Sequence, residues 1–122
     1  MHDTTTTVAQ LRAVMRDFVQ EREWGKYHTP KNLAGSVVVE AGELLELFQW
    51  LTAAEAEGRL KDEPAFKKAV GEELADVLMY LLSLANAADI DVAAAVEAKM
   101  EKNRKKYPAE KVRGHYRRPL PE

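Results

Sequence analysis

The spacing of apolar residues is helical along the whole chain, and no stretch alternates with period two for long enough to form a strand. Glycines and prolines interrupt this spacing and separate four amphipathic segments. The pattern therefore predicts an all-α fold of four helices. The expected helices run from about Thr7 to Glu23, from Pro30 to before Gly58, from Pro64 to about Ala88, and from an Asp91 cap to Tyr107.

Chain length limits the domain organisation. The 122 residues suffice for one hydrophobic core and are too few for two, so residues 1–122 are expected to form a single domain. Residues 113–122 have too little apolar content to fold alone. We expect them to be a flexible tail.

Two of the predicted helices differ in their apolar surface. The first places Leu11 and Phe18 on one face, and its role is expected to be structural. The third contains the run VLMYLLSLANAA at residues 77–88, which is apolar around nearly its whole circumference. The surplus apolar surface, including Met79 and Leu82, is expected to pack against a second subunit. The bundle is therefore predicted to be completed as a homodimer or homotetramer.

Two acidic pairs lie at the same offset from the predicted core. On the second helix, Glu40 and Glu43 fall about 60° and 120° to one side of the apolar stripe. On the third helix, Glu73 and Asp76 fall at the same two offsets. All four carboxylates are therefore expected at the edge of the core.

A solvated surface is the alternative explanation for such charges. Glu46 and Glu72 lie about 160° to 180° from their apolar stripes, so both are expected to face solvent outside any site. A single E-x-x-E or E-x-x-D motif is also common on an exposed helix face. Two pairs on successive helices, neither followed by a lysine or arginine four residues later, favour one shared site.

A divalent cation is the natural counter-charge for four clustered carboxylates. Without it they would repel one another, and the pKa values of the carboxyl groups would rise. Oxygen ligands without cysteine or histidine suit Mg²⁺, or Mn²⁺, better than Zn²⁺. A ferritin-like di-iron site needs a histidine three residues after a helical glutamate, and none of His2, His28 and His115 lies there. The sequence therefore predicts a magnesium site.

Positive charge gathers on the last predicted helix. Its apolar face continues as Lys99, Asn103 and Tyr107, so a stripe expected to point inward becomes cationic and polar. An inward lysine either pairs with a neighbouring glutamate or binds an anionic ligand. The adjacent Arg104 favours the second interpretation, in which this helix neutralises phosphate oxygens.

Composition excludes several other classes of protein. The net charge is −2, so no global field attracts nucleic acid or an anionic membrane surface. The absence of cysteine rules out disulfides, thiolate metal sites and a cysteine nucleophile. The chain also lacks the apolar stretch of a secretory signal or a membrane span. We expect a cytoplasmic protein without nucleic-acid or membrane partners.

Three motifs in order resemble a known family. They are Glu40-Ala-Gly-Glu43-Leu-Leu-Glu46-Leu-Phe-Gln-Trp50, Glu72-Glu73-Leu-Ala-Asp76-Val and Lys99-Met-Glu-Lys-Asn103-Arg104-Lys-Lys-Tyr107-Pro108. Together they resemble the MazG-like all-α nucleoside triphosphate pyrophosphohydrolases, most closely the small dCTP pyrophosphatase branch, over about residues 18–114. The resemblance implies a MazG-like bundle, in dimers or dimers of dimers, with sites built from more than one chain.

The same resemblance assigns roles to residues. Glu40, Glu43, Glu73 and Asp76 match the positions that hold Mg²⁺ and carry catalysis. Residues 23–32 resemble a segment that covers the nucleotide. The expected substrate-binding residues are Trp24, His28, Trp50, Tyr80, Lys99, Asn103, Arg104 and Tyr107.

The residues alone leave alternatives open. Trp24 and Trp50 offer flat faces for a base, but tryptophans in small helical proteins also fill cores. His28 lies in a turn, where capping and ligand contact are both plausible roles. The expected activity is Mg²⁺-dependent hydrolysis of a nucleoside triphosphate, dCTP or a modified dCTP, to the monophosphate and pyrophosphate. The alternatives are the same chemistry on dUTP or another non-canonical nucleotide, and a non-enzymatic helical partner-binding module.

Overall fold

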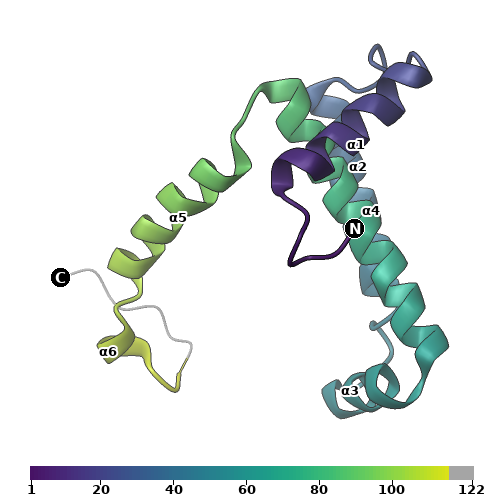
Figure 1. Ribbon diagram of the computed structural model, residues 1–122. Helices are drawn as coiled ribbons and strands as arrows, with labels where there is room; N and C mark the ends of the chain where they lie inside the picture. The colour runs from purple at the N-terminus through teal and green to yellow at the C-terminus, as the bar shows by residue number, and fades with distance from the viewer. Residues whose placement is uncertain (116–122) are drawn as a thin grey trace. The chain divides into compact units, whose positions relative to one another are not determined.

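The computed structural model describes residues 1–115, and this part of the chain is helical without any strand (Figure 1). The predicted all-α class is confirmed. The described residues form six helices rather than the four predicted. They are α1 (Val8–Glu21), α2 (Pro30–Glu46), α3 (Ala53–Asp62), α4 (Pro64–Ala88), α5 (Val92–Lys106) and the short α6 (Ala109–Val112). Most of the predicted flexible tail, residues 116–122, lies outside the described residues.

The prediction of one helix from Pro30 to before Gly58 was wrong. It ends at Glu46, and a separate helix α3 begins after Thr52 and contains Gly58. Thr52 and Glu55 form a capping box: the Glu55 amide donates to Thr52 Oγ1 at 3.1 Å, and the Thr52 amide donates to Glu55 Oε2 at 3.4 Å. This T-x-x-E motif starts a new helix, and a single glycine inside it is tolerated.

Polar caps define the starts of α2 and α5 as the sequence predicts, whereas Glu63 before α4 makes no side-chain capping hydrogen bond. Thr29, which precedes Pro30, accepts a hydrogen bond from the Asn32 amide through its side chain. Asp91 accepts one from the Ala94 amide at 2.9 Å. These bonds satisfy backbone donors that have no partner within the helix. At its other end, α4 terminates at Asp89, whose left-handed φ of 52° stops helical propagation.

The chain divides into two compact units, Met1–Asp89 and Ile90–Glu122. In the first unit, α4 is the central element: α2 and α1 lie along it, and α3 packs near its start (Figure 1). Its buried apolar residues are few, namely Leu33, Phe66, Leu82 and Ala85. Phe66 also meets Phe48 edge to face, with ring centroids 5.6 Å apart, which fixes α4 against the end of α2.

Side-chain hydrogen bonds join α1 to α4. Arg12 Nε donates to Asn86 Oδ1 at 3.0 Å, and Asn86 Nδ2 donates back to the Arg12 carbonyl at 2.9 Å. Arg12 Nη2 also donates to the carbonyl of Ala85 at 3.2 Å. All three bonds are partly buried, where a hydrogen bond is stronger than in water. We call this set the Arg12–Asn86 clasp; it sets the position of α1 on α4.

The first unit leaves large apolar side chains uncovered. On α4, Leu74, Leu78 and Leu81 follow a helical stripe and are 55%, 41% and 44% exposed. The choice of Leu82 as an intersubunit residue was wrong, because its side chain is only 4% exposed and fills the core of its own chain. Met79 is 38% exposed. The predicted surplus of apolar surface on α4 is present, and the stripe of Leu74, Leu78 and Leu81 provides most of it. Val38, Val39 and Leu45 add exposed apolar surface on α2.

The second unit is described separately. Its main element is α5, in which no residue is buried, and Val96 and Met100 are exposed on it. Within residues 1–115 no single helix is long and apolar enough to cross a membrane, and only α4 and α5 counted together reach that length and apolar content.

Candidate metal and nucleotide site

Carboxylates from α2 and α4 converge in the first unit. Glu40, Glu73 and Asp76 each offer one oxygen, and these three oxygens all lie within 4.8 Å of one another. All three residues are half-buried. The shared offset of the two acidic pairs therefore brings one glutamate of α2 beside both acids of α4, since these helices pack along each other.

Glu43 occupies a different position from the other three. Its side chain is exposed, and it shares a hydrogen bond with the carboxyl group of Glu40. It is adjacent to the cluster but is not one of the three converging groups. Glu46 and Glu72 are exposed as predicted, and Glu72 pairs with Lys68 at 3.7 Å.

Crowding changes the proton affinity of the cluster. The pKa of Glu40 is raised to about 7 by a hydrogen bond that its protonated carboxyl group donates to Glu43, by loss of hydration and by the charges of Glu43, Asp76 and Glu73. Loss of hydration, followed by the charges of neighbouring carboxylates, also raises the pKa of Glu73. Each cause penalises the ionised carboxylate. A bound cation would remove this penalty.

The donor set fits a hard divalent cation. Oε2 of Glu40 and Oε2 of Glu73 are buried and make no hydrogen bond within the described residues. Buried oxygens normally have a partner, so two unpartnered ones beside Asp76 leave acceptor capacity for a ligand. An all-oxygen site of this kind suits Mg²⁺ or Mn²⁺.

The acidic cluster borders a cavity of about 360 Å³, which we call the main cavity. The cavity has an acidic side, to which Glu40 and Asp76 contribute, and a side of aromatic and apolar side chains. A small set of polar groups in a mostly apolar cavity is typical of small-molecule sites. Its lining residues are Val14, Met15, Phe18, Trp24, His28, Glu40, Asp76, Met79, Tyr80 and Ser83.

Three rings form an aromatic wall of the main cavity. His28 and Trp24 are stacked with centroids 6.4 Å apart and planes 11° apart, and Phe18 meets Trp24 edge to face at 5.7 Å. His28 Nδ1 donates to the Trp24 carbonyl at 3.0 Å, which orients the imidazole. Of the predicted substrate-binding residues, Trp24, His28 and Tyr80 therefore line the same cavity as the carboxylates.

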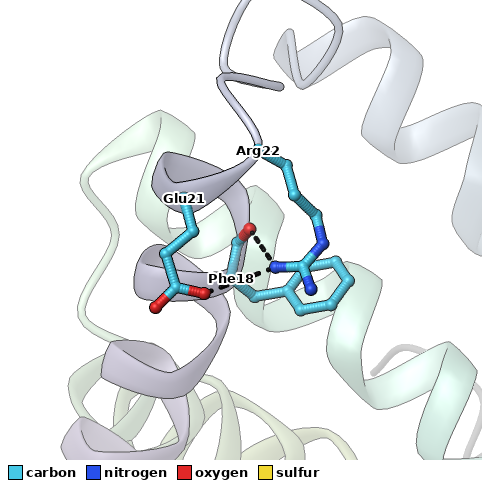
Figure 2. Close-up of polar contacts among 3 residues, drawn as sticks. All are labelled: Phe18, Glu21 and Arg22. Carbon is cyan, nitrogen blue, oxygen red and sulfur yellow. Dashed lines mark hydrogen bonds and ion pairs between the residues drawn. The ribbon is translucent and has the colours of Figure 1, made fainter.

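The guanidinium of Arg22 orders the outer part of the aromatic wall. Figure 2 shows the guanidinium of Arg22 over the ring of Phe18, 3.7 Å from its centroid. Arg22 Nη1 donates to the Phe18 carbonyl at 3.1 Å and lies 3.4 Å from Glu21 Oε2 (Figure 2). These contacts restrict the ring of Phe18, although Arg22 and Glu21 are too exposed for their ion pair to add much stability.

Sequence reasoning missed the contribution of α1 and of Ser83. The helix was expected to be structural only, yet Val14, Met15 and Phe18 line the main cavity. The width of the apolar face of α1, which includes the exposed Phe18 and Val14, could have indicated this role. Ser83 gave no signal, because a serine within an apolar helix has no characteristic spacing.

The other predicted substrate-binding residues are not among those that line the main cavity. Trp50 is 86% exposed in the turn after α2 and is outside the residues lining the main cavity. Lys99, Asn103, Arg104 and Tyr107 belong to the second unit. Lys99 is exposed and α5 buries no residue, so the predicted role of this face in binding phosphate stays a prediction. Arg104 pairs with Glu101 at 2.9 Å.

Comparison with known proteins agrees with this architecture. The sequence profile of the MazG-like family matches residues 36–117, which include both acidic pairs and all of α5. The chain therefore belongs to the MazG-like family.

Individual relatives are similar over most of the chain. It is 43% identical over 108 residues to dCTP pyrophosphatase 1 of Rattus norvegicus and 42% identical over 112 residues to that of Homo sapiens. These alignments cover 88% and 92% of this chain but 63% and 65% of the relatives, so the chain spans less than two thirds of their length. A pyrophosphatase from Archaeoglobus fulgidus superimposes with a TM-score of 0.77 at 46% identity, over 88% of this chain and 98% of that one.

Proposed function

We propose that this chain is a metal-dependent nucleoside triphosphate pyrophosphohydrolase, with dCTP or a modified dCTP as substrate. The observation that carries the proposal is the convergence of three carboxylate oxygens beside a cavity with an aromatic wall. Such a cavity matches a ligand with a polyanionic end and a flat end. The names of the similar dCTP pyrophosphatases and of the archaeal pyrophosphatase support the same chemistry.

The carboxylates have two tasks in this proposal. Glu40, Glu73 and Asp76 would hold the cation, and their two buried, unpartnered oxygens are the best placed ligands. Mg²⁺, when bound there, would offset the charge of the triphosphate and polarise the phosphorus under attack. Glu43 lies beside this group and hydrogen-bonds Glu40, so it is left to orient or deprotonate the attacking water.

The aromatic wall would hold the base. Trp24 and His28 are parallel and stacked, so a third ring can extend the stack, and Tyr80 lies one helical turn beyond Asp76 on α4. In this proposal the base and the phosphates would occupy different parts of one cavity.

The second unit would supply the counter-charge for the phosphates. We propose that Lys99, Asn103, Arg104 and Tyr107 bind phosphate oxygens and that residues 1–122 act as one domain. The family match supports this reading because residues 36–117 include part of each unit. Lys99 is exposed and α5 buries no residue, so these side chains are accessible to a ligand.

We also propose that two or four copies of the chain assemble and that Trp50 contacts the bound nucleotide in this assembly. The exposed leucine stripe of α4 (Leu74, Leu78 and Leu81) and the exposed valines of α2 provide the apolar surface. Sedimentation at micromolar concentration should show a dimer or tetramer. Leu78→Glu should dissociate it, whereas Leu82→Glu should unfold the chain. A wild-type monomer would contradict this part of the proposal.

The decisive experiment is a panel of canonical and modified nucleoside triphosphates with pyrophosphate release as readout, with and without Mg²⁺. The proposal expects Mg²⁺-dependent release that is highest with dCTP or a modified dCTP. A preference for dUTP would keep the chemistry and change the substrate. No release from any nucleotide, together with a melting temperature insensitive to Mg²⁺, would favour a partner-binding module instead.

A further inference from the structure

Ser83 is a buried polar residue that the proposed chemistry does not use. It lies on α4, its side chain is 5% exposed, and its Oγ makes no hydrogen bond within the described residues. In a helix, a serine hydroxyl commonly bonds the carbonyl of the preceding turn. A hydroxyl that is both buried and unpartnered is rare in a folded protein, so it points to a missing partner.

Ser83 stands where two cavities meet. It lines the main cavity and also a second cavity of about 310 Å³, which contains Arg16, Gln20 and Asn86 in its lining. Met15 and His28 are the other residues common to both. A serine hydroxyl moves between three staggered positions by rotation about one bond, so it can turn toward a ligand in either cavity.

The spacing along α4 separates Ser83 from the acidic cluster. It lies seven residues after Asp76, which is about two turns, so both occupy nearly the same helix face about 10 Å apart along the axis. Phosphates at the carboxylates would leave the opposite end of the ligand near Ser83. That end is the base, and a hydroxyl can both donate to and accept from the edge of a base.

We propose that Ser83 is a specificity-determining residue whose hydroxyl hydrogen-bonds the nucleobase where the two cavities meet. This inference rests on the proposed function. It assigns to α4 two separate tasks: Glu73 and Asp76 bind the phosphate end through the cation, and Ser83 two turns later reads the base. A buried hydroxyl that pairs with one base discriminates against others, since a base without the matching group leaves the hydroxyl unpaired.

Ser83→Ala tests the proposal with dCTP as the probe and inorganic triphosphate as a competitor that has no base. We expect the KM for dCTP to rise about three- to tenfold, the equivalent of one neutral hydrogen bond, while the inhibition constant of inorganic triphosphate stays unchanged. The melting temperature of the free protein should stay the same or rise, because a buried hydroxyl without a partner is removed.

Ser36→Ala is the matched control. Ser36 is half-buried on α2 and is outside the lining of both cavities, so neither constant should change. Ser83→Thr keeps the hydroxyl and should retain more of the dCTP affinity than Ser83→Ala.

The outcomes separate this inference from the proposed function. Equal weakening of dCTP and inorganic triphosphate by Ser83→Ala would assign Ser83 to the phosphate end or to the fold, and an unchanged KM would remove it from the site. Either result overturns the inference while an active wild-type protein preserves the proposed function. A wild-type protein that hydrolyses no nucleotide refutes both.

Discussion

Removing the amide of Asn86 should loosen α1 from α4 and weaken nucleotide binding. Asn86→Ala deletes two of the three bonds of the Arg12–Asn86 clasp, the one from Arg12 Nε and the one to the Arg12 carbonyl. A bond to a charged donor contributes about 1.5–3 kcal/mol and a neutral bond about 1 kcal/mol. Alanine recovers roughly 0.6 kcal/mol through its higher helix propensity. The free energy of unfolding should therefore fall by about 2–3 kcal/mol.

Two measurements follow from this estimate. For a chain of this size the melting temperature should drop by roughly 10 °C, and chemical denaturation should report the free-energy loss directly. The KM for the nucleotide should rise, because α1 carries Met15 and Phe18 of the cavity wall. The turnover number should change less, because the carboxylates belong to α2 and α4.

Asn32→Ala is the control for stability. Its side chain donates one exposed bond, to the Tyr27 carbonyl at 3.1 Å, so its removal should cost about 1 kcal/mol or less. An Asn86→Ala protein as stable as the wild type would refute the role given to the clasp. A destabilised protein with an unchanged KM would instead show that the position of α1 does not affect the nucleotide.

Three further predictions concern the acidic cluster and its counter-charge. Asp76→Ala should abolish hydrolysis while the metal-free protein keeps or gains stability, since one of several repelling carboxylates is lost. The control variant Glu72→Ala, at an exposed position, should remain active. Equal loss of activity in the two variants would contradict the assignment. Because the pKa of Glu40 is raised from 4.5 to about 7, the folded state binds this proton more tightly than the unfolded state, so metal-free stability should fall as pH rises from about 4.5 to 7. Saturating Mg²⁺ should reverse that fall. A melting temperature of the metal-free protein that does not change over this pH range would argue against the crowded cluster. Lys99→Met should leave stability within about 0.5 kcal/mol, because Lys99 is exposed, but should lower kcat/KM; unchanged kinetics would remove Lys99 from the site.

Local signals account for the helices and for most of their boundaries. The Thr29–Pro30 and Asp91 starts are confirmed because a cap depends on residues within one turn of each other. The missed start at Thr52 carries the same kind of signal, a capping box with Glu55, so it was available in the sequence. Helical periodicity also correctly separated exposed Glu46 and Glu72 from the cluster.

The sequence by itself determined the helical class, the caps and the face of each helix on which the acids lie, because these depend on neighbours three or four residues apart. Only the tertiary packing of α2 on α4 decided that Glu40, Glu73 and Asp76 converge while Glu43 stays beside them. Packing likewise decided that Leu82 is buried and the Leu74–Leu78–Leu81 stripe is exposed, and that α1 and Ser83 border the cavity. Periodicity shows that a helix has an apolar face, but the neighbour that covers it depends on contacts between residues far apart in the chain.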